Sequence, residues 1–202
     1  MEETSIRIIH SAIELFANKG FYETKVDEIA EKSNVAKGTI YLYFKSKEEI
    51  LNKSIEYITD KTTKNYEVDE NLTFTENLKM IIDKNVEFVK NNISFFKVMF
   101  KNTYEVNRDN IRNSRCNMSA IISEITKLVE IGKKENIVRK DISSSNLSIF
   151  ISNILFSSLM TIVMSIINNY IIKIPIEELK EDLYKFILNG IRGELWEKKQ
   201  WF

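Results

Sequence analysis

The sequence predicts an all-α protein, and three observations lead to this fold class. Apolar side chains recur at steps of three and four along most of the chain, which is the period of an amphipathic helix. One proline and five glycines leave few helix breakers among 202 residues. A chain of this length also buries enough apolar surface for a stable interior. We expect an N-terminal domain of short helices over residues 2–62 and a C-terminal helical bundle over residues 63–202.

The first two expected helices have clear boundary signals. Residues 5–18 place apolar side chains on one helical face, and Gly20 follows as a C-terminal stop. Thr24 with Asp27 three residues later is a variant of the capping box and starts the second helix. Asn34 tolerates the left-handed conformation of a tight turn, so it marks the end of this helix.

A third short helix is expected over residues 36–44, directly after that turn. Two short helices joined by a turn of three or four residues, packed behind a first helix, form the outline of a helix-turn-helix, here over residues 25–44. Ser46 with Glu49 is a capping box for the next helix, which links the two domains.

The C-terminal part is expected to be helical throughout. Short turn-forming stretches separate its helices, and Pro175 lies near the start of the last one, where proline is tolerated. The expected helices lie near residues 74–91, 94–106, 108–135, 145–172 and 176–199.

The third helix divides its side chains between two faces. At 100° per residue, Ile40 and Phe44 point to one side and anchor the helix to the core. The opposite side carries short or apolar side chains, and both edges carry groups that bind phosphate. Ala36 lies at the edge of the buried face, Gly38, Thr39 and Leu42 point away from it, Lys37 and Tyr41 flank one edge, and Tyr43 flanks the other.

This division suits a helix that enters the major groove of DNA, because such a helix needs short side chains toward the bases and phosphate-binding groups along its rims. Gly38 costs about 1 kcal/mol of helix propensity relative to alanine, which a close approach of the backbone to DNA explains. Leu42 suits contact with a thymine methyl group. Positive charge gathers here: residues 32–53 hold five lysines and two glutamates, although the whole chain balances 29 basic against 29 acidic residues.

The stretch ELFANKGFYETKVDEIAEKSNVAKGTIYLYFKSKEEIL resembles the DNA-binding domain of TetR-family transcriptional regulators. A pattern of this length at fixed spacing is highly specific, whereas the rest of the chain matches that family only in length and helical character. The matching features are Phe16, Gly20, Phe21, Thr24, Ile29, Ala30, Val35, Lys37, Gly38, Thr39, Ile40, Tyr41, Tyr43, Phe44, Ser46, Lys47 and Leu51.

The resemblance implies that residues 36–44 form a recognition helix in the major groove of a double-stranded DNA operator. Ala36 stands where a serine often caps this helix and contacts DNA, and Lys25 stands where a second threonine is frequent. Both departures bear on the operator sequence rather than on the fold. The implied phosphate contacts are Thr24, Lys25, Tyr41, Tyr43 and Lys47, and the implied base or groove-wall contacts are Lys37, Gly38, Thr39 and Leu42.

The resemblance also implies a homodimer formed through the last two helices, which would read an inverted repeat with half-sites about one turn of DNA apart. A ligand-responsive repressor is the expected function, with the helix that starts at Lys47 transmitting the switch.

The C-terminal domain offers candidate residues for an effector pocket. Pockets between bundle helices are mostly apolar with a few polar groups. Two sets of residues at helical spacing supply this mixture and predict a site for a hydrophobic small molecule: Phe96, Phe100 and Tyr104 on one helix, and Phe150, Asn153 and Ser157 on another.

Catalysis has no support in the sequence. His10 is the single histidine, so no nucleophile-and-base arrangement forms around it, and the chain has no glycine-rich phosphate loop. Cys116 is the single cysteine and lacks metal-ligand spacing, which favours a reduced, cytoplasmic setting. We expect a non-enzymatic protein that needs no cofactor or metal.

Three alternatives stay open: a DNA-binding protein without an effector, an enzyme that uses the bundle cavity, and a membrane-associated helical protein. The last rests on residues 142–172, which contain no charged side chain and are long enough to span a bilayer. Serine, threonine and asparagine residues interrupt this stretch and lower its tendency to insert. We therefore expect no membrane association and a buried bundle or subunit-interface helix.

Overall fold

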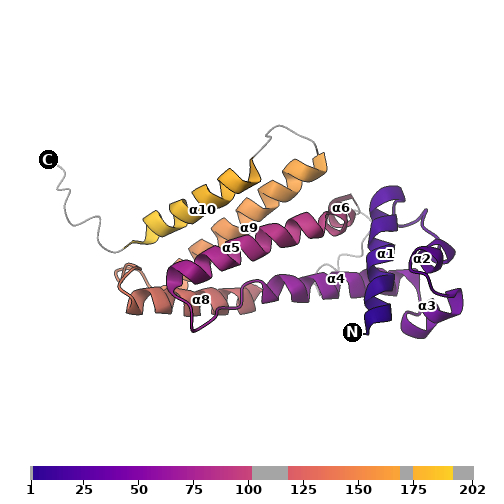
Figure 1. Ribbon diagram of the computed structural model, residues 1–202, viewed down its shortest axis with the longest axis horizontal. Helices are drawn as coiled ribbons and strands as arrows, with labels where there is room; N and C mark the ends of the chain where they lie inside the picture. Colours follow the sequence, from indigo (N-terminus) through magenta and orange to yellow (C-terminus); the bar gives the residue numbers. More distant parts are fainter. Residues whose placement is uncertain (1, 102–117, 169–174, 193–202) are drawn as a thin grey trace. The chain divides into compact units, whose positions relative to one another are not determined.

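The computed structural model describes residues 2–101, 118–168 and 175–192 of the chain (Figure 1). Within these ranges the regular structure is helical, apart from one isolated antiparallel bridge between Val138 and Arg192. The all-α fold class is thereby confirmed. The helices are α1 (Glu3–Lys19), α2 (Val26–Lys32), α3 (Lys37–Tyr43), α4 (Lys47–Lys64), α5 (Phe74–Asn91), α6 (Ile93–Lys101), α8 (Met118–Lys134), α9 (Ser144–Asn168) and α10 (Ile176–Ile191).

The described residues form two compact units. The first contains residues 2–61 together with 92–101, and the second contains residues 62–91, 118–168 and 175–192. The division after Lys61 lies next to the expected domain boundary, whereas α6, expected in the second domain, is grouped with the first unit. Helix α4 is continuous across this division, so its residues up to Lys61 belong to the first unit and its last residues, 62–64, to the second.

Helix α1 supplies much of the core of the first unit. Ile8, Ile9 and Phe16 are almost completely buried, and the Phe16 ring lies 5.1 Å from the ring of Phe21. The helix ends at Gly20, whose φ of 94° is left-handed and whose N–H donates to the carbonyl oxygen of Phe16 at 3.0 Å. Glycine adopts this conformation without a steric penalty, so the predicted stop is confirmed.

The turn between α2 and α3 is closed by backbone hydrogen bonds. Asn34 has a φ of 54°, as predicted for a residue in a left-handed turn, and the N–H of Val35 donates to the carbonyl of Ala30 at 3.0 Å. The cap of α2 differs from the expected one by a residue. Lys25 precedes the helix, and its backbone N–H donates to the Glu28 carboxylate at 2.9 Å, so Glu28 rather than Asp27 completes the cap.

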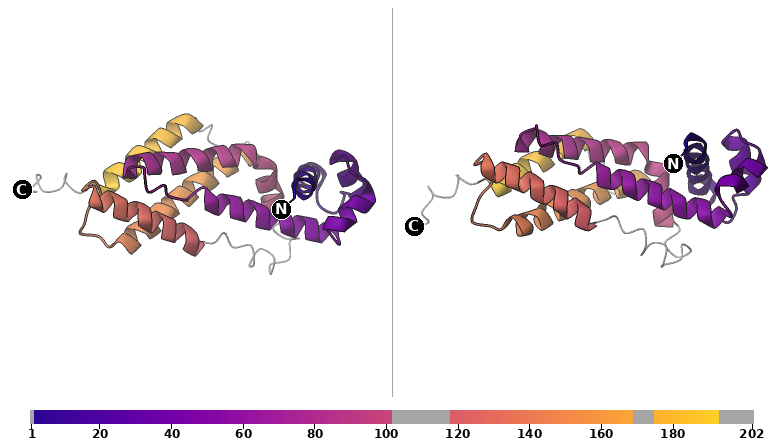
Figure 2. Two further views of the ribbon diagram at one scale, coloured as in Figure 1. Left: turned by 60° about the horizontal axis from the view of Figure 1, so that its bottom comes forward. Right: turned by 90° about the horizontal axis from the view of Figure 1, so that it is seen from below.

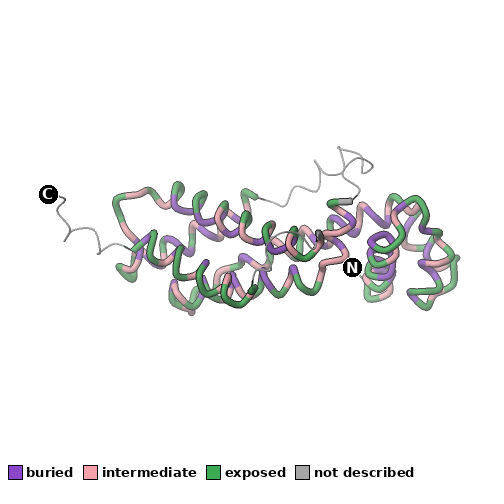
Figure 3. The backbone as a smooth tube through the Cα atoms, turned by 90° about the horizontal axis from the view of Figure 1, so that it is seen from above, coloured by how far each residue is buried: buried purple, intermediate pink, exposed green. Residues whose placement is uncertain are grey.

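The second unit is a bundle of α5, α8, α9 and α10, which lie side by side in both views of Figure 2. Buried and exposed positions alternate along each helix with the helical period, as Figure 3 shows. The core is aliphatic, with Leu78, Ile81, Ile125, Leu128 and Val163 almost completely buried. Burial of these faces against one another, rather than local helix propensity, supplies most of the stability of such a bundle.

Gly132 in α8 lies directly against Phe74 of α5 and Val138. A Cβ atom at this position would lie 2.7 Å from the ring of Phe74, so only glycine fits without a shift. The same residue closes the turn after α8, because its carbonyl accepts hydrogen bonds from the N–H groups of Ile137 at 2.9 Å and Val138 at 3.0 Å. Asn136 in this turn has a φ of 57°.

The last helix ends earlier than predicted. α10 stops at Ile191, where the carbonyl accepts a 2.8 Å hydrogen bond from the N–H of Arg139, and Arg192 is extended. This hydrogen bond pairs the end of α10 with the segment after α8. The predicted remainder of this helix, and parts of the helices expected over 94–106, 108–135 and 145–172, lie outside the described residues.

Candidate nucleic-acid interface

Helix α3 separates a buried face from an exposed face. Ile40 and Phe44 are 1% and 3% exposed, and they fix the helix and its C-terminal cap in the core of the first unit. On the other side Leu42 is 83% exposed and Tyr41 is 50% exposed. The predicted division of this helix is present in the structure.

The start of α3 brings its backbone to the surface. Ala36 precedes the helix, is exposed, and has no side-chain acceptor for the first N–H groups. Gly38 follows in the first turn, where a Cβ atom would meet no neighbouring atom within 4 Å. Thr39 is half-buried on the same turn, and its N–H donates to the carbonyl of Ala36 at 2.9 Å. Packing inside the chain therefore does not require glycine at position 38.

Thr24 lies inside the protein rather than on the surface. Its side chain is 1% exposed, and its hydroxyl donates to the carbonyl of Gly20 at 2.7 Å. The neighbouring Lys25 is exposed. The hydroxyl of Thr24 thus fastens the loop between α1 and α2, and its expected phosphate contact stays a prediction.

Lys47, the first residue of α4, also binds the protein's own backbone. Its ammonium group donates to three carbonyl oxygens, those of Phe21 at 2.6 Å, Tyr22 at 3.2 Å and Thr24 at 3.0 Å. The same group lies 4.4 Å from the centre of the Phe21 ring, a cation–π contact. An ammonium has three protons, so these bonds use all of them and tie α4 to the loop before α2. A phosphate contact by Lys47 stays a prediction.

Two further predicted residues have carboxylate partners. Lys37 forms an ion pair with Asp27, and this carboxylate raises the pKa of the Lys37 ammonium. Tyr43 donates its hydroxyl hydrogen to the Glu2 carboxylate at 2.7 Å, which raises the pKa of the Tyr43 hydroxyl. Both contacts join α3 to other elements of the same unit.

Residues 8–53 match the family model of bacterial regulatory proteins of the tetR family. A stretch of the chain is 38% identical over 81 residues to the fatty acid metabolism regulator protein of Bacillus subtilis, covering 39% of this chain and 42% of that protein. The chain belongs to the TetR family of transcriptional regulators.

Other proteins also resemble this TetR-family regulator, in sequence over part of their length or in fold. The icaADBC biofilm operon negative transcriptional regulator IcaR of Staphylococcus epidermidis is 34% identical over 92 residues, covering 42% of this chain and 49% of that protein. The matches to three Bacillus subtilis relatives, the fatty acid metabolism regulator among them, span 20% to 42% of those relatives' own length. The crystal structure of FadR from Bacillus subtilis in complex with stearoyl-CoA shares the fold, with a TM-score of 0.67, 22% identity, and coverage of 93% of this chain and 99% of that one.

The predicted effector residues of this TetR-family regulator lie in both units. Phe96 and Phe100 belong to α6 of the first unit, where Phe96 is half-buried and Phe100 is 39% exposed. Phe150, Asn153 and Ser157 belong to α9 of the second unit, and all three are exposed. Tyr104 lies outside the described residues. A shared pocket of these residues stays a prediction.

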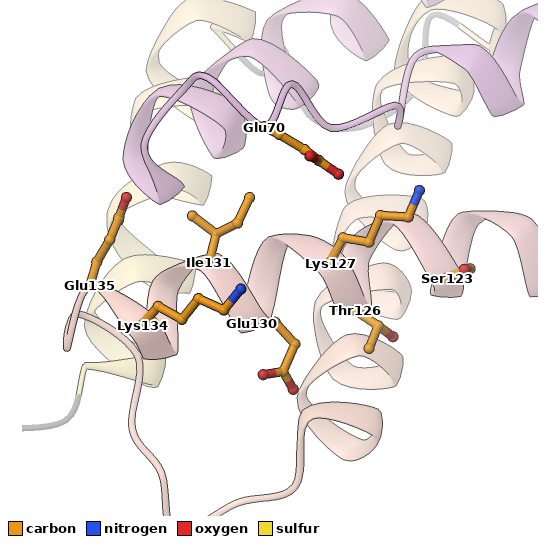
Figure 4. A pocket seen from close by; sticks show the side chains of 8 residues that line it. All are labelled: Glu70, Ser123, Thr126, Lys127, Glu130, Ile131, Lys134 and Glu135. Carbon is orange, nitrogen blue, oxygen red and sulfur yellow. The ribbon is translucent and has the colours of Figure 1, made fainter.

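The second unit has a polar groove along α8, shown in Figure 4. It encloses about 700 Å³ and is lined mostly by charged and hydroxyl side chains of α8, with Glu70 from the segment before α5. None of the predicted effector residues lines it. A second, apolar void between α5, α9 and α10 holds only about 10 Å³, which is the space of a single water molecule. Neither space, as it stands, fits a hydrophobic effector.

Helix α9 leaves an apolar face uncovered. Residues 144–167 have a mean hydropathy of 2.0, long and apolar enough to cross a membrane by length and composition alone, and 33% of the most apolar window is buried in the bundle. The buried side faces the core through Leu147, Ile151 and Leu155. The large apolar side chains left exposed on this helix are Ile149, Phe150, Phe156, Met164 and Ile166.

Sequence reasoning missed the groups that bind the predicted DNA-facing residues. Asp27 is ten residues from its partner Lys37, Glu2 is 41 residues from Tyr43, and the carbonyls bound by Lys47 are 23 to 26 residues away. No local spacing rule connects such pairs. The acidic residues near the helix-turn-helix were the available signal, since they offer carboxylates to long cationic side chains.

Proposed function

We propose that this TetR-family regulator is a sequence-specific transcriptional repressor that binds an inverted-repeat DNA operator as a homodimer and is released by a hydrophobic small molecule. The exposed face of α3 carries the proposal. An 83% exposed leucine and a glycine with open space around it both lie on a helix whose other face is buried. These residues cost stability in isolation, and a partner that approaches the backbone closely explains them.

DNA contact in this proposal comes from the exposed residues around α3 and the start of α2. Lys25 and Tyr41 suit phosphates, and Leu42 suits a thymine methyl group. Thr24 and Lys47 contribute by holding the loop before α2 in place. The remaining proposed contacts are Ala36, Lys37, Gly38, Thr39 and Tyr43. IcaR is by its name a negative regulator, which supports repression rather than activation.

The dimer is proposed to form through α9 and α10. The support is the exposed apolar face of α9, together with Phe186 of α10, which is 66% exposed. Apolar side chains at this density on a monomer surface favour a subunit interface. A dimeric mass, measured on protein purified without detergent, would support this interface and a cytoplasmic protein. Dependence on detergent for solubility would instead favour the membrane-associated alternative.

An acyl-chain molecule is the proposed class of effector. The named fatty acid regulator among the relatives and the stearoyl-CoA bound to FadR both motivate it. The void between α5, α9 and α10 must widen for such a ligand to enter the bundle. Stearoyl-CoA is therefore the first probe, and displacement of bound operator is the response to measure.

The effector residues are tested by substitution. Phe100→Ala and Asn153→Ala, made singly, are each expected to weaken the displacement of operator by stearoyl-CoA. If both variants keep the wild-type response, these residues do not bind the effector. If no acyl compound acts on the wild type at all, the protein is a DNA-binding regulator without this class of effector.

Helix α4 is the proposed transmitter of the switch, because it starts at the helix-turn-helix and continues into the second unit. A ligand that tilts α4 changes the spacing of the two recognition helices in the dimer. Near-complete release requires that the ligand prefer the released state by roughly 5 kcal/mol, which corresponds to about 10⁴-fold in affinity.

The test of the whole proposal is selection of the purified protein against a random duplex DNA library at two salt concentrations. We expect enrichment of an inverted repeat, with binding that weakens as salt rises, because phosphate contacts release counterions. A folded, dimeric protein that enriches no sequence would overturn the proposal.

A further inference from the structure

The lysines around the recognition helix are mostly bound by the protein itself. The sequence gives residues 32–53 an excess of three positive charges. In the fold, however, Lys32 pairs with Glu14 at 2.8 Å, Lys53 pairs with Glu56 at 2.6 Å, and Lys47 binds backbone carbonyls. Within the part of the chain that the structure describes, Lys45 is the member of this group whose ammonium has no carboxylate or carbonyl partner. The DNA-facing surface is therefore less positive than its composition indicates.

The ion pair between Lys37 and Asp27 lies at the start of α3, the end of the helix that is proposed to contact the bases. Asp27 is the second residue of α2 and Lys37 is the first residue of α3, so the pair bridges the two helices of the helix-turn-helix. The ammonium lies 2.8 Å from one carboxylate oxygen and 3.1 Å from the other. The N-terminal residues of a recognition helix are the ones that reach base edges. The Asp27 carboxylate is thus paired with the Lys37 ammonium at the N-terminal end of α3, which is the end proposed to contact the bases.

The helix-turn-helix does not depend on this pair for its fold. Ile29 and Ala30 of α2 and Ile40 of α3 are buried, and the turn between the helices has its own backbone hydrogen bonds. The two side chains of the pair are 53% and 64% exposed. Water and salt screen such a pair, so it forms and breaks easily. Lys37 can leave Asp27 when a better acceptor is present.

We propose that Asp27 is a specificity-determining residue, because its carboxylate holds Lys37 away from the phosphates of unrelated DNA. On the operator, base-edge acceptors such as the O6 and N7 atoms of guanine draw the lysine away from this carboxylate. On other sequences no such acceptor is in reach, and Lys37 stays paired. Non-specific binding is mostly electrostatic, so withholding one cation per subunit weakens it more than it weakens operator binding. This inference rests on the proposed function.

The experiment compares wild type with Asp27→Asn, which keeps the shape of the side chain and removes its charge. Two duplexes are titrated over a series of salt concentrations: the operator enriched from the random library, and a duplex of equal length with its base order shuffled. We expect affinity for the shuffled duplex to rise about tenfold at low salt, with a salt slope steeper by about 2 per dimer. Operator affinity is expected to stay within about threefold of wild type, because the Lys37 contact is already made there.

Two variants show that the effect passes through Lys37. Asp141→Asn removes the same charge from a pair in the segment between α8 and α9, in which the Arg139 side chain donates to the Asp141 carboxylate at 2.7 Å, and it is expected to change neither titration. The double variant Asp27→Asn, Lys37→Gln is expected to return the salt slope for the shuffled duplex to about the wild-type value. A purely structural role of Asp27 would not give this reversal, and thermal unfolding of each variant reports on the fold.

Three results would overturn the inference. In the first, Asp27→Asn behaves as Asp141→Asn does on both duplexes. In the second, operator affinity falls strongly while binding to the shuffled duplex is unchanged, which means that Asp27 itself contacts the operator. In the third, the wild type enriches no sequence from the library, so the proposed function fails and the inference fails with it. The first two leave the proposed function standing.

Discussion

Gly38 and Gly132 both lie within helices, yet their surroundings are opposite. Around Gly132 of α8, a Cβ atom would collide with Phe74 and Val138 of the same unit. Around Gly38 of α3, a Cβ atom would meet nothing within 4 Å. Glycine weakens a helix by about 1 kcal/mol relative to alanine in either place. The first glycine is explained by the chain's own packing, whereas the second is not, and the proposed close approach of DNA accounts for it.

The same contrast, between positions that the chain covers and positions that it leaves exposed, is found among the apolar residues. The aliphatic core of the bundle is covered on all sides, whereas Leu42 and the outer side chains of α9 are left open. The exposed apolar residues of α3 and α9 also differ from each other in the side chains around them. Leu42 lies among lysines and tyrosines, which suit DNA, while the exposed face of α9 carries no charge, which suits a second apolar surface. In the proposed function a partner covers each of these exposed sets, and the charge around each set suits the kind of partner proposed for it.

The largest expected effect concerns the proposed partner of α9. Phe150→Asp places a charge on its exposed face, and twofold symmetry places it twice in the dimer. We expect the dimer to weaken by about 4 kcal/mol, or roughly 10³-fold in its dissociation constant, because each buried aromatic contributes about 2 kcal/mol at such an interface. Sedimentation over a range of concentrations measures this. Tyr22→Asp, which alters an aromatic that is 64% exposed in the first unit, is the control and should leave the mass unchanged.

The bundle core gives the next largest effect. Gly132→Ala is expected to lower the free energy of unfolding by about 1–3 kcal/mol, because the added methyl group must displace the Phe74 ring or the Val138 side chain. Urea unfolding measures it. Gly190→Ala in α10 is the matched control, since open space surrounds that position and the variant should be as stable as wild type or more so. If Gly132→Ala and Gly190→Ala were equally stable, the crowded and the open glycine position would not differ in their effect on stability, which would contradict this explanation.

Substitution of Lys47 tests whether a lysine near the proposed DNA-binding surface stabilises the fold or contacts DNA. Lys47→Met is expected to lower the free energy of unfolding by about 1–2 kcal/mol, because three carbonyls lose a charged donor. Operator affinity should fall without a change in salt slope. Lys45→Gln is the comparison, and it should flatten the slope by about 2 per dimer if Lys45 binds a phosphate. A flatter slope for Lys47→Met would show instead that Lys47 contacts phosphate.

The smallest change in stability is expected at Gly38, and it has the opposite sign from the change in binding. Gly38→Ala should raise the free energy of unfolding by up to about 1 kcal/mol, since alanine is the better helix former and meets no neighbour. The same methyl group should reduce operator affinity, because it stands between the backbone of α3 and the groove. Unfolding and operator titration on one preparation measure both. A variant that is more stable and binds equally well would mean that close approach to DNA does not explain this glycine.

Local patterns in the sequence predicted the elements of the helix-turn-helix and the faces of its recognition helix. Ile40 and Phe44 are buried because their spacing places them on one side of a helix, and that geometry depends only on the local chain. Gly20 and Asn34 were predicted for the same reason, as their conformations are set within a few residues. Membership of the TetR family likewise followed from a contiguous stretch.

Contacts between distant residues could not be predicted in this way. Thr24 looks like a surface hydroxyl at the start of a helix, but the loop after α1 turns it inward to Gly20. Lys47 looks like a free cation, but the start of α4 lies beside three carbonyls of that loop. A lysine side chain is long and flexible, so its partner depends on which segments the fold brings near it. Composition therefore overstated the charge available to DNA.

The bonds of Lys47 also bear on how chimeric regulators should be assembled. A foreign DNA-reading module could be joined to a sensing module at the end of the helix-turn-helix, before α4. A cut at that point would separate the Lys47 ammonium from the carbonyls that it holds, and would strip Ile50, Leu51 and Ile55 from the unit in which they are buried. The continuous part of the first unit extends through most of α4, to Lys61, and a junction there keeps these contacts, although α6, which belongs to the same unit and contacts α1, must be carried along with it.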